Sequence, residues 1–201
     1  MYAVGHLALG YLTGRAAGKH LKVNTNISLL LLASVIPDID LLVPVLEHRG
    51  PTHSLIIFLI ILIPAILIYG KKAVPYFIAL VQHPLIGDYI TGSTQLLWPL
   101  TPHTYGIGIK ITSLPNILLE WSLFLIFMTL AYKTKDIWLL FRHHPSNLLL
   151  STPLFTVLLP TVLNFPTHVP LELLIPHLIY LTLFTLSIIT DLKAILSKWS
   201  V

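Results

Sequence analysis

The sequence predicts an all-α fold, a polytopic membrane bundle of about seven helices with short and kinked spans. Of its 201 residues, 55% are hydrophobic and only 10% are charged, whereas a soluble domain carries about 25% charged residues. The mean hydropathy is +0.84. Apolar segments typical of membrane helices recur between short polar, basic or Pro-rich stretches. They are Ala3–Ala17, Ile27–Leu46, Ser54–Tyr69, Val74–Ile90, Ile117–Tyr132, Leu148–Leu163 and Leu171–Thr190.

The segments differ in length and in their small residues. Only Ile27–Leu46 and Leu171–Thr190 approach the roughly 20 apolar residues of a full span, so the others are expected to be short, tilted or partly enclosed. The glycines of the first segment favour close approach of neighbouring helices. Prolines inside the later runs predict kinks, whose freed carbonyls other helices must satisfy. We expect one integral membrane domain, 1–201, in which 1–110 holds a metal site and 111–201 forms apolar membrane helices.

The basic residues predict a topology, because they fall at alternate helix ends and mark the cytoplasmic side. Ten of the twelve are Arg15, Lys19, Lys22, Lys71, Lys72, Lys133, Lys135, Arg142, Lys193 and Lys198, and the opposite helix ends carry only Arg49 and Lys110. The N-terminus is therefore expected outside and the C-terminus inside. The net charge of +4 is scattered without a basic stripe, so no nucleic-acid partner is expected. The expected partner is the lipid bilayer, and the sequence does not indicate which proteins, if any, the chain binds.

Ionisable residues are costly at membrane depth and usually mark function, and here they gather in the first half of the chain. Three strings carry them, 37–40, 47–54 and 82–88, and counting hairpins places all three at the extracytoplasmic face. His6 joins them, because a rise of 1.5 Å per residue brings it to a similar height in an antiparallel pair. The converging residues are His6, Asp38, Asp40, His48, His53, His83 and Asp88.

These side chains predict a site for one or two divalent metal ions. Cysteine is absent, so the donors are nitrogen and oxygen, which admit zinc first, with manganese or iron as alternatives. Such a site can activate a water and clamp a transferring phosphoryl or acyl group. In the alternative interpretation, Asp38 and Asp40 cap a helix end, His48, Arg49 and Asp88 form an ion network, and His83 is a buried histidine with its hydrogen bonds satisfied.

The order of these strings resembles the YdjM-like inner-membrane metal-dependent hydrolases over roughly residues 1–110. The motifs that carry the resemblance are Gly5-His6-Leu7, Pro37-Asp38-Ile39-Asp40, His48-Arg49-Gly50-Pro51-Thr52-His53-Ser54, His83 with Asp88 and Thr91, and Leu97-Trp98-Pro99. That family is similar to zinc-dependent phospholipase C and related all-helical phosphoesterases. The resemblance therefore implies a reaction class, hydrolysis of a phosphoester, and not a substrate.

One spacing departs from the family pattern, in which the later His and Asp stand four residues apart. His83 and Asp88 are five apart, and Pro84 follows the histidine. Five residues rotate a side chain by about 140° on an ideal α-helix. Either a kink or a π-bulge brings the two groups together, or Asp88 orients a ligating histidine.

The predicted metal contacts are His6, Asp40, His53, His83 and, with that reservation, Asp88. Asp38 is expected to bridge a second ion or to act as general base. We expect Arg49 to clamp an anionic group, and His48 to be a ligand or a general acid. Thr52 and Ser54 are expected to cap the helix that follows them.

Two functions compete. The first is a membrane-embedded hydrolase that acts on a phosphoester or lipid headgroup at the lipid surface. The second is a non-enzymatic metal carrier or scaffold with a structural site. Donors beside an open, water-filled pocket favour the enzyme, whereas donors saturated by protein favour the carrier or scaffold.

Overall fold

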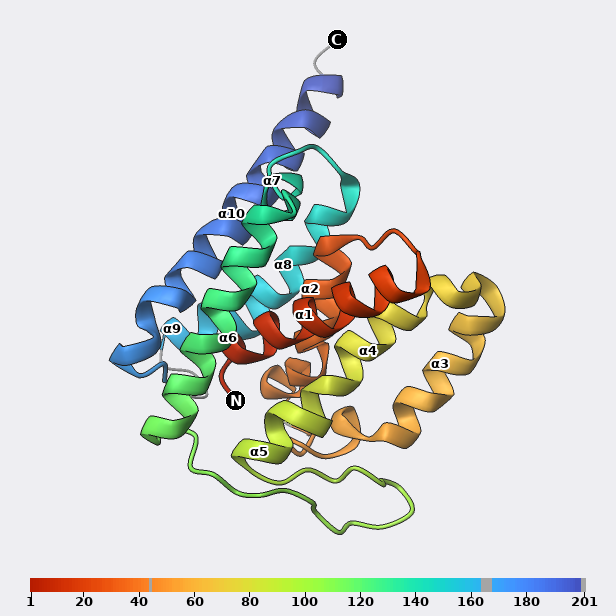
Figure 1. Ribbon diagram of the computed structural model, residues 1–201, viewed down its shortest axis with the longest axis vertical. Helices are drawn as coiled ribbons and strands as arrows, with labels where there is room; N and C mark the ends of the chain where they lie inside the picture. Colours follow the sequence, from red (N-terminus) through yellow and green to blue (C-terminus); the bar gives the residue numbers. More distant parts are fainter. Residues whose placement is uncertain (44, 164–167, 200–201) are drawn as a thin grey trace.

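The computed structural model describes residues 1–43, 45–163 and 168–199, and its regular structure in these ranges is helical (Figure 1). Extended pairing there is limited to one isolated bridge between Thr94 and Tyr105. The all-α bundle predicted from the sequence is therefore confirmed.

The helices follow one another with short turns between most of them. The α-helices are α1 (Ala3–Leu21), α2 (Ile27–Val35), α3 (Leu55–Tyr69), α4 (Val74–Gln82), α5 (Tyr89–Thr91), α6 (Leu114–Lys133), α7 (Asp136–Leu139), α8 (Ser151–Pro153), α9 (Leu159–Val162) and α10 (Leu171–Trp199). The 3-10 helices are η1 (Ile36–Leu42), η2 (Pro51–His53), η3 (Gly70–Lys72) and η5 (Pro145–Leu150). The π-helices are η4 (His83–Asp88) and η6 (Leu154–Leu158).

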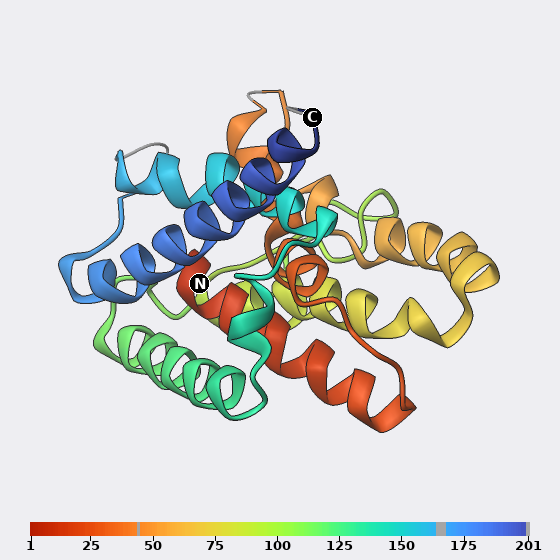
Figure 2. The ribbon, with the colours of Figure 1, turned by 90° about the horizontal axis from the view of Figure 1, so that it is seen from above.

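Helix α1 lies at the centre of the bundle and packs against α2, α4 and α6. Its side chains Leu7 and Tyr11 are enclosed in a core that also contains Leu30, Phe127 and Tyr180. Figures 1 and 2 show α3 and α10 on opposite sides of this centre. The polar strings are thus carried by elements packed around a buried helix.

Among the described residues, four helical stretches are long and apolar enough to cross a membrane. These are Leu55–Lys72, Leu114–Lys133, Pro145–Val162 and Leu171–Ser197. The other three apolar segments of the sequence form α1, α2 and α4, which pack against one another. Their apolar residues serve largely a protein core, and a short apolar run does not distinguish a buried helix from a lipid-facing one.

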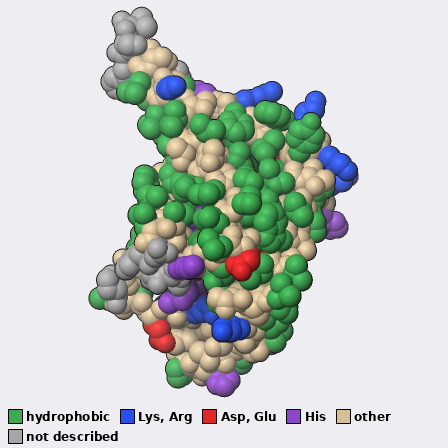
Figure 3. All heavy atoms as spheres, turned by 90° about the vertical axis from the view of Figure 1, so that its left-hand side faces the viewer, with side chains coloured by type: hydrophobic (Ala, Val, Ile, Leu, Met, Phe, Trp, Pro, Cys, Tyr) green, Lys and Arg blue, Asp and Glu red, His purple; other side chains and the backbone are tan. Residues whose placement is uncertain are grey.

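The spans differ in how much lipid-facing surface they present. Only 6% of the Leu55–Lys72 stretch is buried, against 39% of Leu171–Ser197. Figure 3 shows a broad hydrophobic surface on the side of α10, with Lys and Arg at its upper edge and several His at its lower end. An exposed apolar surface of this kind is expected where lipid surrounds the protein.

Candidate metal centre

The predicted site residues come from four separate elements that meet at one end of the bundle. Asp38 and Asp40 lie on η1, His53 ends η2, and His83 and Asp88 begin and end η4. His48 and Arg49 lie in the turn before η2, and His6 lies in the first turn of α1. The structure therefore brings together all seven His and Asp side chains, with Arg49 beside them.

Four donor atoms face one another at the centre of this cluster. His53 Nε2 is 3.2 Å from Asp88 Oδ2 and 3.6 Å from Asp38 Oδ1. His83 Nε2 is 3.3 Å from each of the same two oxygens. Nitrogen and oxygen donors about 2.0–2.2 Å from a tetrahedral ion stand about 3.3–3.6 Å from one another. The group therefore has the size of a metal coordination shell and could hold an ion.

The burial of these donors supports the same conclusion. His53 Nε2, His83 Nε2 and Asp88 Oδ2 are enclosed, and none has a hydrogen-bond partner among the described residues. Buried polar atoms are nearly always paired, so each exception calls for an explanation. The other ring nitrogen of His83 lies 2.8 Å from the Ser34 carbonyl oxygen. Since a carbonyl only accepts, Nδ1 donates there and Nε2 keeps its lone pair for a ligand.

The five-residue spacing of His83 and Asp88 is accommodated by a π-helix. The segment between them, η4, is π-helical, and a π-helix joins residue i to residue i+5. Its first and last residues therefore lie one above the other, and Nε2 and Oδ2 approach to 3.3 Å. Of the alternatives left by the sequence, the π-bulge is the one that the structure contains.

A second group of possible donors, Asp40, His48 and His53, shares a histidine with the first. His53 Nδ1 is 3.3 Å from Asp40 Oδ2, and His48 Nδ1 is 3.0 Å from Asp40 Oδ1. Thr52 donates to Asp40 Oδ2 at 2.6 Å, so it does not cap α3, whereas Ser54 does so as predicted. Burial opposes ionisation of Asp40, but these hydrogen bonds outweigh burial and lower the pKa of its carboxyl.

The chain was also compared with known protein families and structures, and one family matches. The description "YdjM inner membrane protein" matches residues 1–165, which is most of the 201-residue chain. The chain belongs to the YdjM inner membrane protein family. It is a membrane protein, as its four apolar helices also indicate. No curated protein and no solved structure matches it.

A small cavity of about 50 Å³ opens beside the cluster of this YdjM-family chain. Its lining includes the charged or ionisable side chains of Asp38, His48, Arg49 and Asp88. Its other walls include Ile111 and Val157, from the part of the chain expected to form only membrane helices. The cavity is large enough for water, so the Asp38 side of the cluster is not sealed by protein.

Arg49 lies over the cluster, where hydrogen bonds fix it and a neighbouring glycine leaves room for its guanidinium. Its φ of 65° is left-handed, its N–H donates to Asp40 Oδ2 at 3.3 Å, and its Nη2 donates to Asp88 Oδ1 at 2.9 Å. A Cβ on Gly92 would lie 1.6 Å from Arg49 Nη1. Only glycine therefore leaves room for the guanidinium in this position.

His6 lies behind His83 and outside both groups of donors. The two rings stack with centroids 3.6 Å apart, and His6 Nε2 is 3.5 Å from Asp88 Oδ1. A Cβ on Gly87 would lie 2.3 Å from His6 Cε1. Burial, followed by the nearby His83, lowers the pKa of His6 to about 3. His6 is thus neutral and lies close to Asp88, and neither of its ring nitrogens has a hydrogen-bond partner among the described residues.

One buried side chain near the cluster was not singled out from the sequence. Glu120 of α6 is fully buried and accepts hydrogen bonds from the backbone N–H groups of Tyr2 at 2.8 Å and Gly5 at 3.0 Å. It satisfies free donors at the start of α1, next to His6, where a carboxylate also complements the helix dipole. A lone Glu in an apolar run was the signal that could have found it, because such residues are costly in membranes.

Proposed function

We propose that the chain is a membrane-embedded, metal-dependent hydrolase that cleaves a phosphoester or a related lipid-headgroup bond. The observation that supports this proposal best is the meeting of three buried donor atoms, none with a hydrogen-bond partner among the described residues, beside a cavity lined in part by Asp38, His48 and Arg49. Catalytic metal sites combine three protein ligands with an open position for water or substrate. The three donor atoms and the cavity beside them support such an arrangement.

In this proposal His53, His83 and Asp88 hold one ion, with zinc the first choice and manganese or iron as alternatives. The ion would lower the pKa of a water ligand and polarise the scissile group. Asp40 and the Ser34 carbonyl oxygen orient the two histidines through their other ring nitrogens, which fixes each tautomer and sharpens the ligand geometry. Asp40 is then an orienting group, and His6 supports the His83 ring by stacking.

The residues around the cavity have separate roles in the proposed reaction. Asp38 is the general base, because its carboxylate lies beside the donor atoms and its side chain is still 9% exposed. Arg49 binds the anionic group of the substrate with its planar guanidinium. His48 is 41% exposed and lies next to Asp40, so it can donate a proton to the leaving group.

The location of the site agrees with a substrate at the lipid surface. The cluster lies where α1 begins and α4 ends, while the basic turns lie at the other ends of the same helices. By the charge rule the basic ends are cytoplasmic. We therefore propose that the site faces the extracytoplasmic side, that the C-terminus is cytoplasmic, and that no nucleic acid is involved.

A second candidate function is a structural or carrier site. The supporting observation is that Asp38 completes a set of four buried donors at tetrahedral spacing, and closed four-ligand sites are typical of structural zinc. In this alternative the ion ties η1, η2 and η4 together, and no substrate enters.

The test is hydrolysis of a panel of phosphomonoesters, phosphodiesters and phospholipids by the detergent-purified protein loaded with zinc or manganese. We expect activity that chelation abolishes and that Arg49→Ala lowers while metal content is unchanged. Arg142→Ala, at the opposite end of the bundle, is the matched control and should keep full activity. Stoichiometric metal without hydrolysis of any panel member, together with a large loss of thermal stability on chelation, would favour the structural site.

A further inference from the structure

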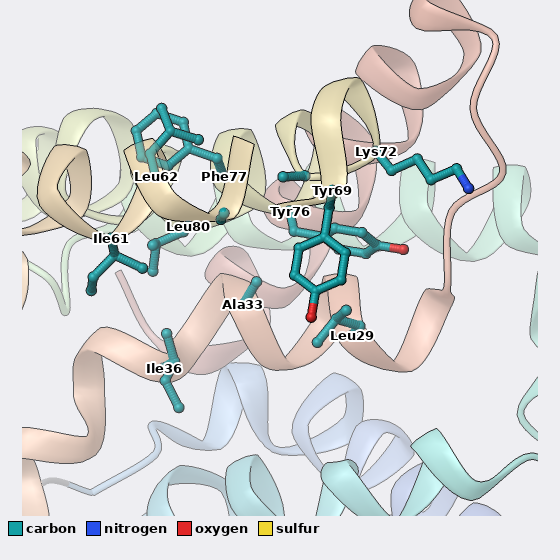
Figure 4. Close-up of a pocket in the computed structure, with 12 residues that line it drawn as sticks. Leu29, Ala33, Ile36, Ile61, Leu62, Tyr69, Lys72, Tyr76, Phe77 and Leu80 are labelled. Atoms are coloured by element: carbon teal, nitrogen blue, oxygen red, sulfur yellow. The ribbon is translucent and has the colours of Figure 1, made fainter. Parts of the chain in front are cut away.

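A second, apolar groove lies between α3 and the pair α2 and α4, away from the metal cluster (Figure 4). Its volume of about 340 Å³ lies within the range of about 300–1,000 Å³ usual for ligand pockets. Leu29, Ala33 and Ile36 line one wall, and Ile61, Phe77 and Leu80 line the other side. It shares no lining residue with the small cavity beside Asp38.

The polar groups of the groove gather at one end. Tyr69, Lys72 and Tyr76 lie together there, whereas Ile36 and Ile61 lie toward the other end (Figure 4). In the part of the chain that the structure describes, neither the Lys72 ammonium nor the Tyr69 hydroxyl has a hydrogen-bond or ion-pair partner. A positive charge and the free Tyr69 hydroxyl thus stand at one end of an otherwise apolar channel, where the Tyr76 hydroxyl oxygen already accepts a hydrogen bond from the Asn26 N–H.

The exposed apolar side chains on the outer side of α3 indicate that lipid surrounds the groove. Leu59, Ile60, Ile63 and Leu67 are between 50% and 81% exposed, and the span to Lys72 has a mean hydropathy of 2.2. A helix with so little protein cover is surrounded by acyl chains in a bilayer. The groove therefore opens onto lipid along the length of α3.

We propose that this groove binds an anionic phospholipid. One acyl chain lies between α3 and α2, and the phosphate lies at the Lys72 ammonium and accepts a hydrogen bond from Tyr69. Basic residues at a membrane surface attract anionic lipids, and Lys71 adds a second charge next to Lys72. An inserted peptide fits poorly, because aliphatic walls leave its backbone groups without partners.

The bound lipid fills the space between α3 and the rest of the bundle. Helix α3 begins at Leu55, two residues after His53 at the end of η2, so a lipid at this place supports the helix that follows a donor histidine. The proposed lipid is distinct from the substrate of the metal site, because its phosphate lies at the basic end of the helices. The inference stands whether or not the chain is a hydrolase.

The test uses the full chain in phosphatidylcholine nanodiscs that contain a trace of phosphatidylglycerol with a photoactivatable acyl chain. We expect labelled peptides at the groove lining, with labelling reduced about fivefold in Lys72→Ala, the factor expected for one basic residue at an anionic surface. Ala33→Trp should fill the groove and remove the labelling. Lys133→Ala, at the end of α6, is the matched control and should leave it unchanged.

A phosphatidylcholine probe with the same photoactivatable chain separates the headgroup from the acyl chain. Weaker labelling by that probe supports recognition of the anionic headgroup. Equal labelling by the two probes, or labelling that persists in Ala33→Trp, would overturn the proposal.

Discussion

The described residues include two π-helices, η4 and η6, and the two differ in the side chains that they carry. Both adjoin a proline, since Pro84 lies inside η4 and Pro153 directly precedes η6. Helix η4 has a histidine at its first position and an aspartate at its last, whereas η6 buries Leu154, Val157 and Leu158 in the apolar core. A proline removes a helical hydrogen bond and crowds the preceding turn. The irregular backbone is therefore common to both π-helices. Only in η4 do two side chains five residues apart, His83 and Asp88, converge on the cluster.

The second π-helix shows what the same backbone does without ligands. The Leu158 carbonyl oxygen, at the end of η6, accepts a hydrogen bond from His177 Nε2 of α10 at 2.8 Å. This contact joins two membrane helices, as expected for a buried histidine at membrane depth. A π-helix thus serves packing in one place and donor alignment in the other.

The largest expected effect comes from changing the spacing in η4. Inserting one alanine after Ile86 separates His83 and Asp88 by six residues, so one donor leaves the cluster. The loss of an orienting group lowers metal affinity by about 10–100-fold. We expect a larger fall here, because a ligand itself is lost. Deleting Leu85 instead gives the four-residue spacing of an ideal helix and should preserve binding. Metal titration measures both.

The control for the spacing variants is the same alanine insertion in η6, after Thr156. It should lower metal affinity much less than the insertion in η4, because η6 supplies none of the donor atoms and reaches the cluster only through the cavity wall at Val157 and its packing against η1. Equal metal loss from insertions in η4 and η6, in proteins that keep their helix content, would contradict the difference between the two π-helices.

The next largest effect is expected at Asp40, which orients His53, the histidine that faces the donor atoms of η4. Asp40→Asn weakens the hydrogen bond to His53 Nδ1, and we expect a loss of about 10–100-fold in metal affinity. Asp136→Asn is a matched control, because Asp136 is equally buried but pairs with Arg15 at the basic end. If the two variants bound metal equally, Asp40 would have no part in the site.

Glu120→Ala separates the support of the cluster from its chemistry. The change leaves the Tyr2 N–H without its acceptor, whereas the Gly5 N–H keeps the Tyr2 carbonyl oxygen at 3.1 Å, and an unsatisfied buried group costs about 1–3 kcal/mol. We expect a lower free energy of unfolding in detergent, with stoichiometric metal retained at saturating concentration. Glu120→Gln, which keeps one acceptor oxygen, should recover part of the stability.

The smallest effect belongs to the second π-helix. His177→Phe removes the hydrogen bond to Leu158 but keeps an aromatic ring, so the stability loss should be about 0.5–1.5 kcal/mol. Metal content should not change. A loss of metal in this variant would show that the two π-helices are coupled, which their separate contacts do not predict.

The sequence predicted the helical bundle and the convergence of the polar residues, because apolar runs and ionisable groups follow strong physical rules. Of its seven apolar segments, four correspond to helices in the described residues that are long and apolar enough to cross a membrane, while the other three form α1, α2 and α4, which pack against one another. The π-helix at His83 was one of several alternatives, because a proline in a helix is compatible with a kink or with a bulge. The orienting role of the Ser34 carbonyl oxygen was not predictable, because every residue has a carbonyl group.

The most direct test of the account is elemental analysis of metal in the detergent-purified protein, for the wild type, a His83→Ala, Asp88→Ala double variant and His177→Phe. We expect stoichiometric metal in the wild type and in His177→Phe, and its loss from the double variant. No metal in a folded wild type after loading with zinc or manganese, or equal metal in all three proteins, would contradict the assignment of η4 as the element that aligns the donors.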